Sequence, residues 1–97
     1  MRTVSLEEYG PILSSRSIGE VVYERIKKEV NEGEVTVDLS TIRSMATFCA
    51  KQIFGRLYVE LGQRKFFDRL TIKGADDNLK TIIQIGIQNA LEEAPKA

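Results

Sequence analysis

The chain has 97 residues, with 14 basic and 14 acidic side chains and therefore a formal net charge of zero at pH 7. This length suits a single domain with one small core, and we expect residues 1–97 to form one domain, ordered over about residues 3–91. The neutral charge argues against nucleic-acid binding, which depends on Lys and Arg neutralising phosphates. It permits self-association into a homodimer, because little net repulsion opposes it.

Residue types that carry much of enzyme and metal chemistry are scarce. The sequence contains no histidine and a single cysteine, Cys49, so an internal disulfide is excluded and a zinc site is close to excluded. No convergent acid, base and nucleophile are visible, and we expect neither an enzyme nor a bound metal or cofactor. No segment has the apolar length of a membrane span, and the N-terminus lacks the apolar region of a signal peptide. We therefore expect a cytoplasmic protein without membrane contacts.

The first third of the chain predicts a strand followed by a helix. Residues 3–6 suit a short strand, to which residues 12–13 could add a hairpin partner, so that the sheet would have four strands and be mixed. Ser17 and Glu20 have the spacing of a capping box, which predicts a helix with Ser17 as its N-cap and Gly33 at its end. The apolar face of this helix is expected to contain Ile18, Val22, Ile26 and Val30.

The middle third predicts a strand, a polar turn and a long helix. β-Branched residues predict a strand over residues 34–39, and the hydroxyl-rich residues 40–47 are typical of a turn and a helix cap. Apolar side chains recur every four residues from Cys49 to Leu61, which predicts an amphipathic helix that ends near Gly62. Because Cys49 lies on this apolar stripe, we expect it to be buried rather than reactive.

Residues 63–69 show no clear element. Phe66 and Phe67 within this stretch are expected to pack against the core. The basic residues around them are Arg64, Lys65, Arg69 and Lys73. Aromatic and basic residues in alternation can bind single-stranded nucleic acid, and an acidic protein partner is a further option, but a solvated loop with two core anchors is the preferred interpretation.

The last part of the chain predicts a third strand and a third helix. Residues 70–72 suit a strand that ends at Gly74, and Asp76 can cap the helix that follows. Three isoleucines alternate as they would in a strand, but the cap and the four-residue apolar spacing favour a helix; these are Ile83, Ile85 and Ile87. Pro95 is expected to end the ordered region.

The predicted order of elements is β-α-β-α-β-α. Alternation of this kind predicts an α/β fold, in which helices pack on a small sheet that is mostly parallel or mixed. The crossover connections are expected to be right-handed.

Three motifs in this order resemble the STAS fold of bacterial anti-sigma factor antagonists. They are VTVDLSTI at residues 35–42, ATFCAKQIFGRLYVELG at 46–62 and LTIKG at 70–74. The closer resemblance is to the small, stand-alone STAS-like family of unknown function, and the pair Ser15-Arg16 before the first helix also fits.

The resemblance implies a binding site at the start of the second helix. In the antagonists, an Asp-Ser pair lies there, and a kinase that is also an anti-sigma factor phosphorylates the serine. In this chain Ala46 stands at the Asp position and Thr47 at the acceptor position. The resemblance thus implies a protein partner that is an ATP-binding kinase or an anti-sigma-like protein.

The candidate site residues lie in the turn and at the start of the second helix. Thr47 and Ser44 are the candidate phospho-acceptors, although the preferred interpretation of a hydroxyl there is a helix cap that accepts from a free backbone N–H, and the two roles can coexist. Asp38 ends a strand, where ligands often bind α/β sheets, but it could equally stabilise the turn. The candidate partner-binding residues are Asp38, Ser40, Arg43, Thr47 and Lys51.

The preferred interpretation is a non-enzymatic, regulatory protein-binding module that phosphorylation at the second helix switches. The alternative is a structural or oligomerising subunit without a covalent switch, for which Tyr58 and Val59 are candidate contact residues. A small enzyme is the weakest interpretation. The sequence names neither the partner nor the biological pathway.

Overall fold

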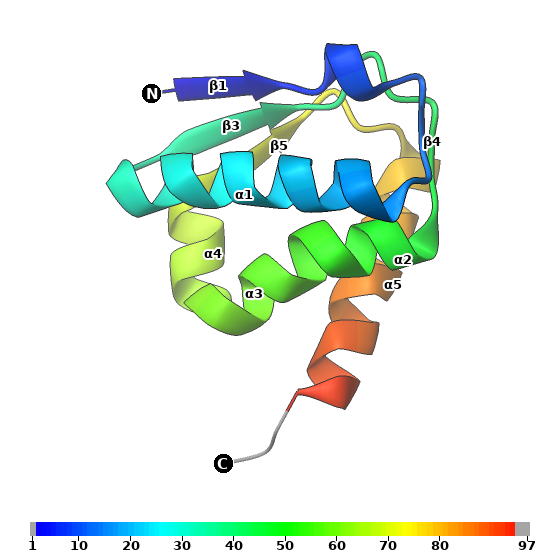
Figure 1. Ribbon diagram of the computed structural model, residues 1–97. Coiled ribbons are helices and arrows are strands. Elements are labelled where there is room, and N and C mark those ends of the chain that lie inside the picture. The colour runs from blue at the N-terminus through cyan, green and yellow to red at the C-terminus, as the bar shows by residue number, and fades with distance from the viewer. Residues whose placement is uncertain (1, 95–97) are drawn as a thin grey trace.

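The computed structural model describes residues 2–94, and it has two layers (Figure 1). One layer is a parallel sheet of three strands, β1 (Arg2–Ser5), β3 (Val35–Asp38) and β5 (Leu70–Lys73), with β3 in the centre. The long helices form the other layer and lie on one face of this sheet. The predicted α/β fold with a small, mostly parallel sheet is confirmed.

The alternation of side chains along the strands explains why only one face of the sheet is covered. Val4, Val37 and Ile72 lie opposite one another in register and contribute to the core. Successive side chains of a strand point to opposite faces, so the neighbouring row of Thr3, Thr36 and Thr71 lies on the outer face. This outer row is polar, which suits a face that no helix covers.

The helical layer contains α1, a long central helix, α4 and α5. The segments α2 (Thr47–Ala50), η2 (Lys51–Gly55) and α3 (Arg56–Leu61) follow without a break, and η2 is π-helical. We call residues 47–61 the central helix; its predicted end near Gly62 is confirmed. The other helical segments are η1 (Glu7–Tyr9), α1 (Arg16–Glu32), α4 (Gln63–Arg69) and α5 (Asp77–Glu93).

Helix α1 starts two residues earlier than the capping-box pattern predicted. Ser15 is the N-cap, and its hydroxyl oxygen accepts from the Ile18 N–H at 3.3 Å. Ser17 is already inside the helix, so the prediction that it is the N-cap was wrong. The helix ends at Gly33, as predicted, with φ at 155°. Its buried face contains Gly19, Val22, Tyr23, Ile26 and Val30, whereas Ile18, predicted to lie on that face, is exposed.

Helix α5 crosses the central helix at glycines. A Cβ atom added to Gly86 would lie 2.6 Å from the Lys51 backbone nitrogen, and one added to Gly55 would lie 2.6 Å from the Gly86 carbonyl oxygen. The two helices therefore touch backbone to backbone at this point. Asp76 caps α5 by accepting from the Leu79 N–H at 2.8 Å, which confirms the predicted helix start and excludes the alternative strand.

Residues 12–13 do not extend the main sheet. They form β2 (Ile12–Leu13), which pairs in parallel with β4 (Ser44–Met45) in a separate sheet of two short strands. The prediction of a hairpin with the first strand, and of a mixed sheet of four strands, was therefore wrong. The physical reason is a long-range pairing in which the N–H groups of Arg43 and Ser44 donate to the Pro11 carbonyl.

Residues 63–69, without a clear element in the sequence, form the short helix α4. Phe66 is buried with 2% of its surface exposed, as expected, but Phe67 is 63% exposed, so the expectation that Phe67 packs against the core was wrong. Neighbouring residues of a helix point about 100° apart, and in α4 this turns Phe66 toward the core and Phe67 toward solvent. Pro95, predicted to end the ordered region, lies outside the described residues.

Candidate functional site

The central helix starts without a side-chain cap. Its N-cap residue, Ala46, has extended backbone angles and no side chain that can accept a hydrogen bond. Thr47 is the first helical residue and is exposed, and within residues 2–94 its hydroxyl makes no hydrogen bond. The interpretation of Thr47 or Ser44 as a helix cap was therefore wrong, whereas their role as phospho-acceptors stays a prediction.

A two-residue pairing holds the start of the central helix in place. Ser44 and Met45 form β4, which pairs with β2, and the Ala46 N–H donates to the Leu13 carbonyl at 2.9 Å. Met45 is buried, but the Ser44 side chain is exposed. Both hydroxyl-bearing candidates, Ser44 and Thr47, thus face solvent on a fixed backbone.

Asp38 stabilises the turn that follows β3. Its Oδ1 atom accepts from the Ser40 N–H at 2.9 Å and from the Ser40 hydroxyl at 2.5 Å, which confirms the turn-stabilising interpretation. These two hydrogen bonds, followed by the charge of Lys73 on the adjacent strand, lower the pKa of the Asp38 carboxyl. Gly74, with φ at 78°, lets the next loop pass directly against Ser40.

The structure divides the predicted partner-binding residues between two places. Asp38 ends β3 and Ser40 lies in the loop that follows, whereas Thr47 and Lys51 lie on the central helix in the other layer (Figure 1). Arg43 lies between them in sequence, immediately before β4, and its side chain is exposed. The predicted residues therefore do not form a single cluster.

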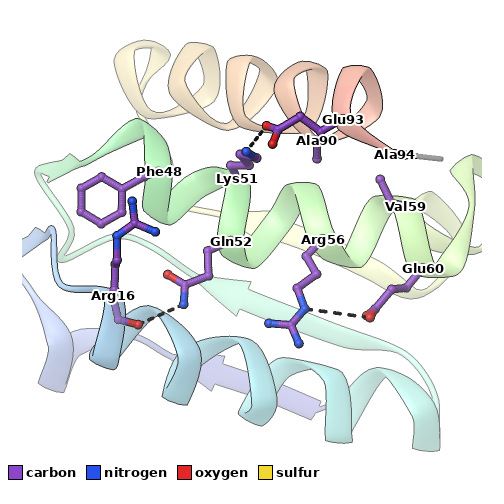
Figure 2. Close-up of a pocket in the computed structure, with 10 residues that line it drawn as sticks. All are labelled: Arg16, Phe48, Lys51, Gln52, Arg56, Val59, Glu60, Ala90, Glu93 and Ala94. Atoms are coloured by element: carbon purple, nitrogen blue, oxygen red, sulfur yellow. Dashed lines mark hydrogen bonds and ion pairs between the residues drawn. The ribbon is translucent and has the colours of Figure 1, made fainter.

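A groove along the central helix contains most of the site residues that were not predicted from the sequence. It has a volume of about 440 Å³ and lies between the start of α1, the central helix and the end of α5 (Figure 2). Of the predicted site residues, it contains Lys51. The central helix contributes Phe48, Gln52, Arg56 and Glu60. These four recur every fourth residue on one helix face, which is the sequence signal that could have revealed them.

Hydrogen bonds and ion pairs order the rim of this groove. The Arg16 guanidinium lies 4.8 Å from the centre of the Phe48 ring, and the Gln52 amide donates to the Arg16 carbonyl at 3.0 Å. Gln52 also donates to Glu20, which is the largest cause of the lowered pKa of the Glu20 carboxyl. Arg56 pairs with the same carboxylate at 3.0 Å.

The groove combines apolar side chains with charged ones. Phe48 is 37% exposed and Val59 is 39% exposed, so the groove offers apolar surface between charged residues of both signs. Lys51 pairs with Glu93 of α5 across it. Such a surface can take an amphipathic protein segment, with its apolar side chains on Phe48 and Val59.

The single thiol of the chain lies in the core. Cys49 is buried, as predicted, and burial raises the pKa of its thiol. Within residues 2–94, no three His, Cys, Asp or Glu side chains lie close enough together to hold a metal ion. No helix in that part of the chain is both long enough and apolar enough to cross a membrane.

A family model described as "STAS-like domain of unknown function (DUF4325)" matches residues 19–80. The match includes most of α1, the strand β3, the whole central helix and β5. No curated protein and no solved structure was found to match the chain. The family match covers more than half of the sequence and contains all three motifs from which the resemblance was drawn. The chain belongs to the family of STAS-like domains.

Proposed function

We propose that this STAS-like domain is a non-enzymatic regulatory module that binds a protein partner with the surface around Thr47. One observation carries the proposal: Thr47 presents an unbonded hydroxyl to solvent at the uncapped start of the central helix. The groove with Phe48 and Lys51 lies beside it and supplies contact area for the partner. Arg43 and Ser44, both exposed, extend the same surface toward the loop.

Phosphorylation of Thr47 would switch this surface. A phosphate there would meet backbone N–H groups that have no acceptor at the start of the helix, together with the positive end of the helix dipole. The fold would therefore tolerate it, while about 1.5 to 2 negative charges would be added to the contact surface. Ser44 is the second candidate acceptor, but it lies in β4 and lacks the helix N–H groups.

The kind of partner follows from the family resemblance. An ATP-binding kinase or an anti-sigma-like protein would dock on the unmodified surface and would be released when Thr47 carries a phosphate. Asp38 at the end of β3 and Ser40 in the loop after it lie apart from this surface, so they would contact only a partner that reaches the end of the sheet.

A second candidate function is a subunit that self-associates without a switch. The groove favours it, because exposed apolar side chains lie there between charges of both signs, as a contact between identical copies requires. Light scattering over a concentration range tests this function, since a constitutive dimer would keep twice the chain mass on dilution.

Affinity capture from the source cells tests the switch. The baits are the wild type, Thr47→Ala and Thr47→Glu, with Thr81→Glu as a control that adds the same charge to an exposed threonine on α5. We expect an ATP-binding kinase or anti-sigma-like prey on the wild type, Thr47→Ala and Thr81→Glu baits, and about a tenfold loss on Thr47→Glu, as for a charge placed in an interface. Mass spectrometry should find phosphate on Thr47 of the wild-type bait.

Equal recovery of every prey by all four baits would refute the switch. Recovery of only further copies of the chain, without phosphate on Thr47, would support the self-associating subunit instead.

A further inference from the structure

An aromatic side chain stands out from the short helix α4, at the other end of the central helix from Thr47. Phe67 is the most exposed of the large apolar side chains in residues 2–94, with 63% of its surface accessible. Its ring packs edge-on against Phe66 at 5.4 Å between ring centres and against Tyr58 at 6.0 Å. Because Phe66 is buried, this cluster anchors Phe67 to the core and limits its motion.

The charged residues beside Phe67 are mostly unpaired cations. In the described part of the chain, no carboxylate lies within ion-pair distance of Arg64, Lys65 or Arg69. Arg69 instead donates to the Val30 carbonyl at 3.1 Å. Asp68 is the single acidic residue of α4. By contrast, the ion pairs of the groove satisfy Lys51 and Arg56 internally.

A hollow on the surface adjoins this aromatic residue. It has a volume of about 510 Å³ and is lined by Gln63, Arg64, Phe67 and Asp68. A second hollow, of about 540 Å³, involves Arg64, Lys65 and Arg69 on the same helix. A partner segment that covers Phe67 could therefore place side chains beside it and near these cations. Rigid aromatic residues with cations nearby are typical anchors of protein interfaces.

We propose that α4 is a second docking surface, on which an acidic segment of a partner protein buries Phe67 and pairs with Arg64 and Lys65. Charge complementarity carries the choice of partner, because the surface offers uncompensated positive charge around one apolar anchor. The proposal does not depend on phosphorylation of Thr47, since Thr47 and α4 lie at opposite ends of a central helix that is roughly 20 Å long, although the groove along that helix reaches Glu60.

The structure favours an acidic protein segment over single-stranded nucleic acid. Binding of single strands requires several exposed aromatic rings on which successive bases stack. Here Phe66 is buried and Tyr58 is partly buried, so Phe67 alone is available within the cluster.

Selection from a displayed library of random peptides of about twelve residues tests the proposal on the full chain. We expect the enriched peptides to carry acidic residues around an apolar one. Their binding is then measured by fluorescence anisotropy, together with that of an oligonucleotide of about fifteen thymidines. Phe67→Ser and the double variant Arg64→Glu, Lys65→Glu should each weaken peptide binding about tenfold or more, as expected for an anchor and its charge partners.

Two matched variants serve as controls. Lys80→Glu reverses an exposed cation on α5, and Val21→Ser removes an exposed apolar side chain from α1, so both should bind the peptides as the wild type does. Circular dichroism should show that every variant remains folded, since Phe67 contributes little buried area.

Three results would overturn the proposal. They are enrichment of no acidic peptide, unchanged binding by Phe67→Ser and the double charge reversal, and tighter binding of the oligonucleotide than of the peptides. The last result would assign α4 to nucleic acid instead.

Discussion

Hydroxyl groups in the turn and helix start after β3 have different environments, although they look alike in the sequence. The Ser40 hydroxyl donates to Asp38, so it is committed to the turn. The Thr47 hydroxyl has no such partner in the described chain and faces solvent at the helix start. Of the two, Thr47 is therefore the residue that a modifying enzyme could reach without breaking an internal hydrogen bond.

The lowered pKa of Asp38 makes stability depend on pH in a defined direction. A carboxyl whose pKa is lower in the folded protein stabilises the fold above its ordinary pKa of about 3.9, and this stabilisation is lost as the pH falls through the lower value. We expect Asp38→Asn to be less stable than the wild type at neutral pH and the difference to shrink in acid. Urea unfolding at several pH values measures it.

An exposed carboxylate outside this turn provides the control. Asp68→Asn removes a charge from α4, where the described chain provides no hydrogen-bond partner for that side chain, and should change stability little at any pH. A loss of stability in Asp38→Asn that stayed constant from neutral to acidic pH would contradict the assignment.

At the scale of elements, α5 and the central helix can cross this closely because glycines, which have no side chain, stand at the point of contact. Ala50 and Ala90 lie next to the two glycines at this contact. The contact falls in the π-helical segment η2, in which the backbone departs from the regular α-helical ladder. The close approach of the two helices therefore explains why small residues recur on both.

Gly86→Ala should destabilise the fold although alanine favours helices. The added Cβ would lie 2.6 Å from the Lys51 nitrogen and 2.7 Å from the Ala50 carbonyl carbon, and backbone atoms cannot rotate away. We expect a loss of about 1–3 kcal/mol or more in the free energy of unfolding, as for overpacked cores. Urea unfolding followed by circular dichroism measures it.

The matched control is Gln84→Ala, on an exposed face of the same helix. It should leave stability unchanged or raise it slightly, because helix propensity alone then acts. If Gly86→Ala were as stable as Gln84→Ala, the helices would not approach as closely as described.

For the whole molecule, the sheet has one central strand and two edges. The N–H groups of Arg2 and Leu6 donate to the carbonyls of Glu34 and Asp38, on the side of β3. Because successive N–H groups of a strand point to opposite sides, those of Thr3 and Ser5 point away from β3, toward the open edge of the sheet. We expect the amides of Thr3 and Ser5 to exchange with deuterium quickly, and those of β3 to exchange slowly. Hydrogen exchange resolved by NMR measures this contrast.

Dilution provides the control for this measurement. Slow exchange at Thr3 and Ser5 that persists in dilute protein would contradict the open edge. Slow exchange that disappears on dilution would instead indicate that a second copy covers β1.

The features that could be predicted from the sequence are those that depend on neighbouring residues. The alternation of Val35 and Val37 predicted the central strand, and Asp76 predicted the start of α5, because strand faces and helix caps are local properties. The pairing of β2 with β4 could not be predicted, since it joins residues about thirty positions apart through backbone groups that every sequence shares.

The candidate site was predictable only in part for the same reason. Thr47 followed from its place in a motif, but the groove combines Arg16 of α1, Phe48 of the central helix and Ala90 of α5, which meet only in the folded chain. The exposed Phe67 was missed because residues 63–69 carry no cap residue, so no helical phase could be assigned to its two adjacent phenylalanines.

The glycine crossing also constrains how this protein can evolve. A lineage that kept this packing could vary Thr3 and Thr71 on the outer face of the sheet more freely, since no helix of residues 2–94 packs on that face. Positions 55 and 86 could accept no larger side chain unless the two helices moved apart. Proteins that descend from this chain should therefore keep glycine at both positions, although these two glycines take no direct part in binding.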